Sequence, residues 1–285
     1  MTQLGRMIAP GRTSDVYEFG AGSVVKVPRP RVPAAWASIE AEITVAVHGL
    51  GLPTPAVRGL EVVDGRDSIV FERIDGRSMW EEVLDGSRDV TRAAAGLAEI
   101  QLSIHQAQPP AVLLGIPDRV RPKIEAACQL PQSERDEARR LLGSLPQATA
   151  LCHGDLHPGN VLMSGRGPVV IDWFDAAIGS PIADVVRSSL LIRPPAGPAE
   201  LYHLPGSSPE VLSRFHRDYV ERILADLEVP ADLARCWEAV LAVSRLSEQA
   251  EPDDSCLLDL WRARQGDPSS PLLDMISAAR RADEE

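Results

Sequence analysis

The sequence predicts an α+β protein with two lobes, a β-rich amino-terminal lobe followed by a mainly helical carboxyl-terminal lobe. Short runs rich in β-branched and aromatic residues, separated by turns that contain glycine, occupy much of residues 1–75. From residue 78 onwards, apolar residues recur at spacings of three and four, which is typical of amphipathic helices. A chain of 285 residues is long enough for two packed lobes with a sizeable core. We assign residues 1–75 to the first lobe, 76–270 to the second and 271–285 to a carboxyl-terminal tail.

Two hairpins are expected in the amino-terminal lobe. The first joins strands at 16–19 and 24–27 through Gly20-Ala21-Gly22, and the second joins strands at 60–63 and 68–71 through Asp64-Gly65. An Asp-Gly pair favours a tight hairpin turn because both residues tolerate positive φ. A connector near residues 71–77 then leads to the helical lobe.

A helix is expected between these hairpins, over residues 34–49. Its apolar residues recur at three- and four-residue spacing, at Trp36, Ile39, Ile43, Ala46 and Val47. Glycines at positions 49 and 51 end this helix, and prolines at 53 and 55 keep the following chain extended.

The second lobe is predicted to hold one hairpin among its helices. Helices are expected over residues 90–106, 133–143, 182–192, 209–227 and 231–248, with prolines at several breaks between them. Two short strands, 160–163 and 168–171, are separated by Ser164-Gly165-Arg166-Gly167. A cleft between two such lobes is a natural position for a nucleotide.

Charge and composition narrow the class of partner. The charged fraction of 25% and the hydrophobic fraction of 44% are ordinary for a soluble globular protein. The formal net charge of −12 argues against nucleic acid as the main partner, because that contact depends on Lys and Arg that neutralise phosphates. The same charge suits a cationic small molecule, which an acidic cleft would attract.

A cytoplasmic location is expected from two features. The amino terminus lacks the apolar core of a signal peptide, and no segment approaches the apolar run, about 18 residues or longer, of a membrane span. The four cysteines at 128, 152, 236 and 256 are isolated in sequence, which predicts free thiols in a reducing compartment. Nothing in the sequence indicates an oligomeric state.

The stretch from His153 to Asn160 is the most informative part of the sequence. It reads His-Gly-Asp-Leu-His-Pro-Gly-Asn, and its proline and glycines predict a loop in place of a helix. Asp155 and Asn160 lie five residues apart, and Asp172 follows twelve residues later at the end of the hairpin. In phosphoryl transfer from a nucleotide, one Asp orients a hydroxyl and accepts its proton, while an Asn and a second Asp hold Mg²⁺ against the phosphates. We therefore predict a catalytic base at Asp155 and Mg²⁺ ligands at Asn160 and Asp172.

Two other interpretations of this stretch are weaker. Asp155 and Asn160 also suit turn caps, but a cap does not explain Asp172 beyond the hairpin. The spacing of His153 and His157 occurs at zinc sites on helices, but this segment is a loop and has no evident third ligand. We favour His153 as a structural residue that hydrogen-bonds the loop.

Lys26 and an acid on the following helix are predicted to position the nucleotide phosphates. A lysine within the apolar strand 24–27 needs a partner, and a Lys–Glu pair grips the α- and β-phosphates in kinase-type sites. Glu40 and Glu42 compete for this role. We favour Glu40, because Ile43, Thr44 and Val47 place it on the apolar face of the helix.

Two backbone segments complete the predicted nucleotide site. The turn at residues 10–17, which includes Ser14, has backbone N–H groups that can cover phosphates. The segment from Glu72 to Ile74 lies where the first lobe ends, and its backbone is expected to hydrogen-bond an adenine edge. A plain hairpin and a plain linker are the alternatives for these two segments.

These residues together resemble the aminoglycoside phosphotransferase family, small-molecule kinases with a protein-kinase-like fold. The resemblance covers roughly residues 5–250 and is strongest at 153–175. It implies that Asp155 is the catalytic base, that Asn160 and Asp172 bind Mg²⁺, and that Lys26 with Glu40 positions the phosphates of ATP or GTP. It also implies that Asp184 is a buried acid that braces the catalytic loop.

Three features depart from the patterns of related kinases, and the last two bear on the substrate. Ser180 stands where family members often have Asp, and Trp173-Phe174 replaces the Phe-Gly of protein kinases. No Ala-Pro-Glu stretch follows to anchor an activation loop, which argues against protein substrates. The resemblance therefore implies a small-molecule hydroxyl acceptor, with an aminoglycoside-type antibiotic as one candidate.

We expect an amino sugar to be met by carboxylates at positions 175, 238, 248, 251, 253 and 254, although a solvated acidic face explains most of them equally well. Two functions are the alternatives to a kinase of an antibiotic. One is a housekeeping kinase of choline, a sugar or an amino-alcohol, and the other is a non-catalytic nucleotide-binding regulator.

Overall fold

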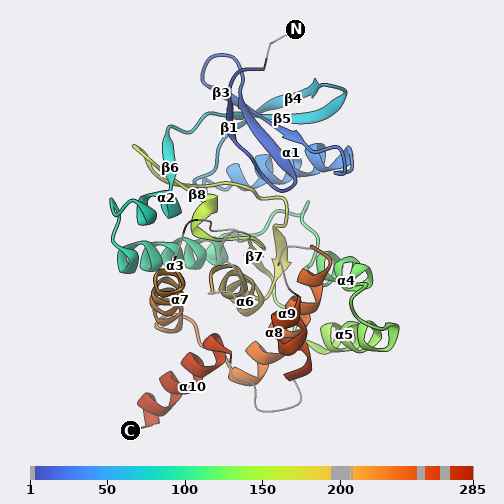
Figure 1. Ribbon diagram of the computed structural model, residues 1–285, viewed down its shortest axis with the longest axis vertical. Helices are drawn as coiled ribbons and strands as arrows, with labels where there is room; N and C mark the ends of the chain where they lie inside the picture. The colour runs from blue at the N-terminus through green and yellow to red at the C-terminus, as the bar shows by residue number, and fades with distance from the viewer. Residues whose placement is uncertain (1–3, 194–205, 207, 249–253, 264–269, 285) are drawn as a thin grey trace.

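The computed structural model describes residues 4–193, 206, 208–248, 254–263 and 270–284. Its strands are concentrated in an upper lobe and its helices in a lower lobe (Figure 1). This arrangement confirms the predicted α+β class. Positions 251 and 253, two of the predicted acceptor-binding acids, lie outside the described residues.

The upper lobe is built on one antiparallel sheet with the strand order β1-β2-β3-β5-β4. These strands are β1 (Met7–Ala9), β2 (Ser14–Glu18), β3 (Ser23–Pro28), β4 (Val57–Val63) and β5 (Arg66–Glu72). Both predicted hairpins are present, and their turns have positive φ at Gly20, Gly22, Asp64 and Gly65. The turn residues therefore indicated the strand pairing correctly.

Helix α1 (Ala35–His48) packs against β4 and β5. Because side chains alternate along a strand, Lys26 points to the opposite face from Val25 and Val27, and the side chain of Lys26 reaches Glu40 on α1. The predicted apolar face needs one correction, because Ile39 is 39% exposed whereas Glu40 is buried.

The lower lobe contains the five predicted helices, each within three residues of its predicted ends. These are α3 (Val90–Gln106), α5 (Gln132–Ser144), α6 (Pro181–Ile192), α7 (Pro209–Leu224) and α8 (Ala231–Leu246). Four helices were not predicted: α2 (Met79–Leu84), α4 (Ile116–Ala126), α9 (Ser255–Ala263) and α10 (Pro271–Glu284). In α4 the pattern was obscured by Pro117, which the first turn of a helix tolerates, and by Pro122 inside the helix.

Two small sheets hold the segment that follows α5. Strand β7 (Ala150–Cys152) pairs with β10 (Ala177–Gly179), and β8 (Val161–Ser164) pairs with β6 (Gly76–Ser78) and β9 (Gly167–Val170). The predicted hairpin is confirmed as β8 and β9. Strand β8 begins one residue later than predicted, and β9 begins one residue earlier. Residues 153–160 form the loop that joins β7 to β8, and this loop ends in a single 3₁₀ turn, Pro158–Asn160.

One large apolar core fills the lower lobe, and two smaller clusters lie on the two faces of the upper sheet. Helix α10 contacts α7 and α8 and buries Leu272, Leu273 and Ile276. The cysteines at 128, 152, 236 and 256 are all free thiols. Among the described helices, none combines the length and the apolar character that a membrane span requires.

Candidate active site

The loop at 153–160 is held from beneath by Asp184 in the first turn of α6. The backbone N–H groups of Gly154 and His153 donate to Asp184 Oδ1 at 2.7 Å and Oδ2 at 3.2 Å. Gln101 Nε2 and His105 Nε2 each donate to Oδ2 at 2.9 Å. Burial alone would raise the pKa of Asp184, but the hydrogen bonds from His105, Gln101 and Gly154 outweigh it and lower that pKa. Asp184 is therefore a buried carboxylate that fixes the loop backbone.

Gly154 allows this loop to approach the segment after β9. Its φ is 77°, and a Cβ at this position would lie 2.3 Å from the carbonyl oxygen of Asp175. Only glycine combines this left-handed conformation with so close a contact. The glycine thus positions Asp155, the next residue, against the segment that contains Asp172 and Asp175.

His153 has the structural role that the sequence predicted. Its Nδ1 accepts a hydrogen bond from the backbone N–H of Asp155 at 3.2 Å, and its Nε2 donates to the carbonyl oxygen of Ile171 at 3.2 Å. The imidazole also packs on Trp173, with 4.6 Å between ring centroids. His157 Nδ1 likewise accepts from the N–H of Gly159 at 3.1 Å, and burial lowers the pKa of His157. Both rings are used to shape the loop.

Asp155, Asn160 and Asp172 are brought together at the ends of the hairpin. Asn160 Nδ2 donates to the backbone oxygen of Asp155 at 2.9 Å. This hydrogen bond directs the side-chain carbonyl oxygen of Asn160 away from the backbone of Asp155. The backbone oxygen of Asn160 accepts from the N–H of Ile171 at 3.0 Å, so Asn160 lies beside the residue before Asp172. An amide oxygen and a carboxylate are the ligand types that Mg²⁺ prefers, so this donor set fits the predicted metal. Asp172 has a φ of 64°, which is rare outside glycine and is more common at functional sites.

Lys26 lies between two carboxylates. Its Nζ is 2.7 Å from Glu40 Oε1 and 3.0 Å from Asp172 Oδ1, so the structure pairs Lys26 with Glu40 and not with the exposed Glu42. Burial lowers the pKa of Lys26, but Asp172 and Glu40 together raise it above its ordinary value. Burial raises the pKa of Glu40 to about 7, because Lys26 only partly offsets burial and the repulsion from Asp172. Two acids thus share one ammonium group.

The other predicted nucleotide residues lie in or next to strands of the upper lobe. Ser14 is the buried first residue of β2, directly after the turn, and Gly11 N–H donates to Asp15 Oδ1 at 3.3 Å. Glu72 ends β5, and its carboxylate accepts from Arg166 at 2.8 and 3.0 Å. Ile74 lies in the connector between β5 and β6. The binding roles of these three residues remain predictions.

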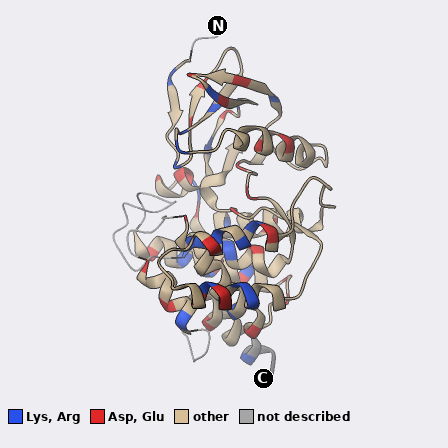
Figure 2. Cartoon of the chain, turned by 90° about the vertical axis from the view of Figure 1, so that its right-hand side faces the viewer, with Lys and Arg blue, Asp and Glu red and all other residues tan. Residues whose placement is uncertain are grey.

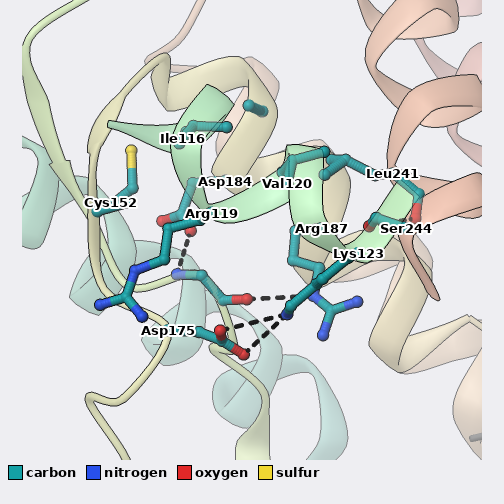
Figure 3. Close-up of a pocket in the computed structure, with 13 residues that line it drawn as sticks. Ile116, Arg119, Val120, Lys123, Cys152, Asp175, Asp184, Arg187, Leu241 and Ser244 are labelled. Atoms are coloured by element: carbon teal, nitrogen blue, oxygen red, sulfur yellow. Dashed lines mark hydrogen bonds and ion pairs between the residues drawn. The ribbon is translucent and has the colours of Figure 1, made fainter. Parts of the chain in front are cut away.

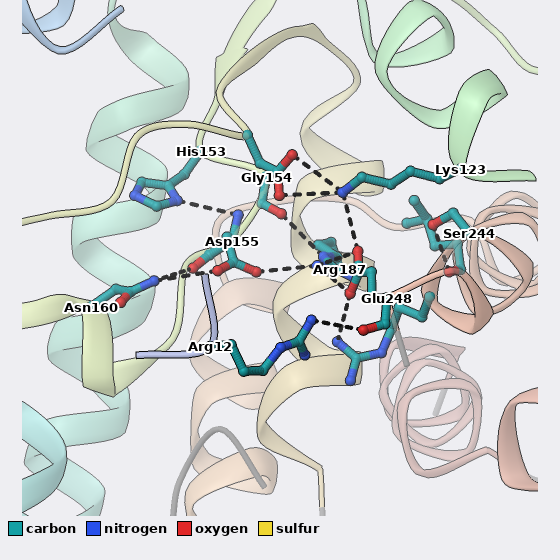
Figure 4. Close-up of polar contacts among 12 residues, drawn as sticks. Arg12, Lys123, His153, Gly154, Asp155, Asn160, Arg187, Ser244 and Glu248 are labelled. Carbon is teal, nitrogen blue, oxygen red and sulfur yellow. Dashed lines mark hydrogen bonds and ion pairs between the residues drawn. The ribbon is translucent and has the colours of Figure 1, made fainter. Parts of the chain in front are cut away.

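A second charged cluster, which the sequence did not predict, lies beside Asp155 (Figure 4). Arg187 on α6 donates from Nη2 to Asp155 Oδ1 at 3.1 Å and to Glu248 Oε1 at 3.0 Å. Lys123 on α4 donates to Glu248 at 3.1 Å and to both oxygens of Asp175 at 3.2 Å. Arg12, from the turn before β2, donates to the backbone oxygen of Glu248 at 3.0 Å. The sequence had indicated Asp175 and Glu248 only as acceptor-binding acids, and the signal for Arg187 was its position a single helical turn after Asp184.

Comparison with known proteins identifies the family. A model of the phosphotransferase enzyme family matches residues 5–204. The chain belongs to the phosphotransferase enzyme family. The enzyme class and the family predicted from the sequence are therefore confirmed. No curated protein matches the chain.

Solved structures share the fold of this phosphotransferase. An aminoglycoside 3'-phosphotransferase of type VIII is 22% identical over 88% of this chain and 94% of its own, with a TM-score of 0.58. A choline/ethanolamine kinase family protein from Mesorhizobium loti is 16% identical over 96% and 92%, with a TM-score of 0.55. An aminoglycoside phosphotransferase from Streptomyces rimosus, solved with ADP and streptomycin, is 16% identical over 84% and 92%, also with a TM-score of 0.55. These similarities confirm the protein-kinase-like fold.

Proposed function

We propose that this phosphotransferase is an ATP- and Mg²⁺-dependent kinase that transfers the γ-phosphoryl group to a hydroxyl of a small molecule. The observation that supports this most directly is the position of Lys26 between Glu40 and Asp172, 2.7 and 3.0 Å from their oxygens. Lysines in such pairs position nucleotide phosphates in kinase-type sites. Related structures have been solved with ATP or ADP, which supports ATP as the donor.

In this proposal each predicted residue keeps its role. Asp155 orients the acceptor hydroxyl and takes its proton, and Asn160 and Asp172 would hold Mg²⁺. When bound, Mg²⁺ neutralises the charge that develops on the phosphates. The turn that includes Ser14 covers the phosphates, and the backbone of Glu72 and Ile74 receives the adenine.

Two acceptor classes remain candidates, an aminoglycoside-type antibiotic and a hydroxylated metabolite. The aminoglycoside kinases among the related structures support the first. A specific observation favours the second: Asp175 and Glu248, two of the acids expected to meet an amino sugar, already form ion pairs with Lys123 and Arg187. A panel of aminoglycosides, choline, sugars and amino-alcohols, assayed for nucleotide turnover, separates these classes.

The proposed base is tested with Asp155→Ala. We expect turnover to fall by about 10²–10⁴-fold, because proton transfer by a positioned side chain contributes about this much. Nucleotide affinity should be largely retained, since Asp155 is not among the proposed phosphate ligands. A turnover rate near that of the unmodified enzyme would refute the assignment.

A further inference from the structure

A pocket opens beside the catalytic loop and is formed by the helical lobe alone (Figure 3). Its walls come from α4, α6 and α8 and from the segments around Gly154 and Asp175, with no residue of the upper sheet or α1 among those described as lining it. Lys26 and the turn before β2, which are proposed to hold the nucleotide, belong to the upper lobe. The pocket adjoins Asp155 through Gly154 and Arg187, and it therefore suits the acceptor.

Five charged side chains line this pocket. Arg119 and Lys123 on α4 and Arg187 on α6 are the cations, and Asp175 and Asp184 are the carboxylates. Asp184 already accepts hydrogen bonds from the backbone of the catalytic loop. Asp175 is therefore the lining carboxylate that is closest in role to a ligand-binding group. Burial lowers the pKa of Lys123, but Asp175 and Glu248 together raise it, so Lys123 is charged at neutral pH. On the side of the molecule that carries α4 and α5, basic and acidic residues are interleaved along the helices (Figure 2).

Arg119 differs from the other two cations in its partners. Lys123 is paired with Asp175 and Glu248, and Arg187 with Asp155 and Glu248. No carboxylate in the described part of the chain lies within ion-pair distance of Arg119, and its buried Nε has no hydrogen-bond partner there. The guanidinium instead lies over the ring of Phe174, 5.4 Å from the centroid.

We propose that Arg119, with Lys123 beside it, binds an anionic group of the acceptor, a carboxylate or a phosphate, while an acceptor hydroxyl faces Asp155. This inference rests on the proposed function, and it specifies the chemical class of the acceptor. A guanidinium with unused donors binds such oxygens through paired N–H bonds. The net charge of −12 does not by itself decide the charge of the ligand, because salt screens charges beyond roughly 8 Å, so the groups next to Arg119 matter most. An aminoglycoside would instead place ammonium groups against Arg119.

The test compares sugars that differ in charge. The probes are d-glucuronate and d-glucose 6-phosphate as anions, d-glucose as the neutral sugar and d-glucosamine as the cation. Calorimetry on the full chain without nucleotide should give at least about tenfold higher affinity for one of the anions than for d-glucose, and still weaker binding of d-glucosamine. Arg119→Gln should remove the preference, whereas Arg119→Lys, which keeps the charge, should retain most of it.

Arg121→Gln is the matched control, because Arg121 lies on the same helix, is exposed and contacts Asp118 at 3.7 Å. It should leave the preference unchanged. Equal affinity for all four sugars, preference for d-glucosamine, or an anion preference that survives Arg119→Gln would each overturn the inference. The binding measurement needs no phosphoryl transfer. A failure of the proposed function would appear separately, as the absence of Mg²⁺-dependent ATP binding or turnover.

Discussion

Arg187 holds Asp155 through two contacts: its Nη2 donates to Asp155 Oδ1 and its Nε to the backbone oxygen of Gly154, both at 3.1 Å. Asp184, one turn earlier on the same helix, accepts the N–H groups of His153 and Gly154. One turn of α6 therefore fixes both the backbone of the loop and the side chain of Asp155. Glu248 completes the arrangement by accepting from Arg187 at 3.0 and 3.1 Å.

We expect Arg187→Lys to slow turnover by about 10²-fold, because a small displacement of a catalytic group costs about this much. A lysine keeps the charge but cannot make both contacts of the planar guanidinium. The KM for the nucleotide should change little, since Arg187 belongs to the helical lobe. Steady-state kinetics with the acceptor found in the panel test this, and an unchanged kcat would contradict the positioning role.

Glu248→Gln is expected to change how stability depends on pH. Burial would raise the pKa of Glu248, but Arg187, Lys123 and Arg245 outweigh it and lower the pKa from 4.5 to about 2. The ion pairs therefore contribute fully above pH 4.5, and their contribution is lost as the pH falls from 4.5 towards 2. One pKa unit corresponds to about 1.4 kcal/mol, so the contribution is about 3 kcal/mol.

Denaturant unfolding between pH 2 and 6 measures this effect. Glu248→Gln should lower the free energy of unfolding at pH 6 and flatten its decline in acid. Glu61→Gln, at an exposed position of β4, should follow the unmodified protein. If both variants declined in acid as the unmodified protein does, the ion pairs of Glu248 would not contribute as described.

Gly154→Ala is predicted to reduce both stability and turnover. The new Cβ would lie 2.3 Å from the carbonyl oxygen of Asp175 in a backbone with φ of 77°. Left-handed strain alone costs about 1–2 kcal/mol, and the clash would displace Asp155. Gly143→Ala is the control, since a Cβ there meets no atom within 4 Å and α5 should gain up to about 1 kcal/mol. Thermal unfolding of the two variants should therefore shift in opposite directions.

Asp172→Asn is expected to raise the Mg²⁺ concentration for half-maximal turnover by at least about tenfold, because a neutral oxygen replaces a charged ligand. Asp64→Asn is a matched control: Asp64 also has positive φ, at 49°, but lies in the exposed turn between β4 and β5. Titrating Mg²⁺ after treatment with a chelator gives the comparison. An equal Mg²⁺ requirement in the two variants would exclude Asp172 as a ligand.

Local sequence patterns were sufficient to predict a turn or a helix where the residues that specify it are neighbours in the sequence. The turns at Gly20-Ala21-Gly22 and Asp64-Gly65 predicted both hairpins of the upper sheet, because few other residues adopt positive φ there. Helix α3 was predicted with its observed ends, because its apolar residues are regularly spaced. Helix α4 was missed because its two prolines look like helix breakers, although the first falls where proline is tolerated.

The sequence by itself determined the two-lobed class, the loop at 153–160 and the choice of Glu40 over Glu42, since turns and helical faces depend on neighbours along the chain. Only the tertiary structure revealed the cluster of Lys123, Arg187 and Glu248 beside Asp155. Arg187 and Glu248 are 61 residues apart, and no local pattern links a cation on α6 to an acid after α8. The net charge of −12 suggested a cationic acceptor. The local charge at the pocket is decided by which side chains the fold brings together, because electrostatic interactions in a protein act over short distances.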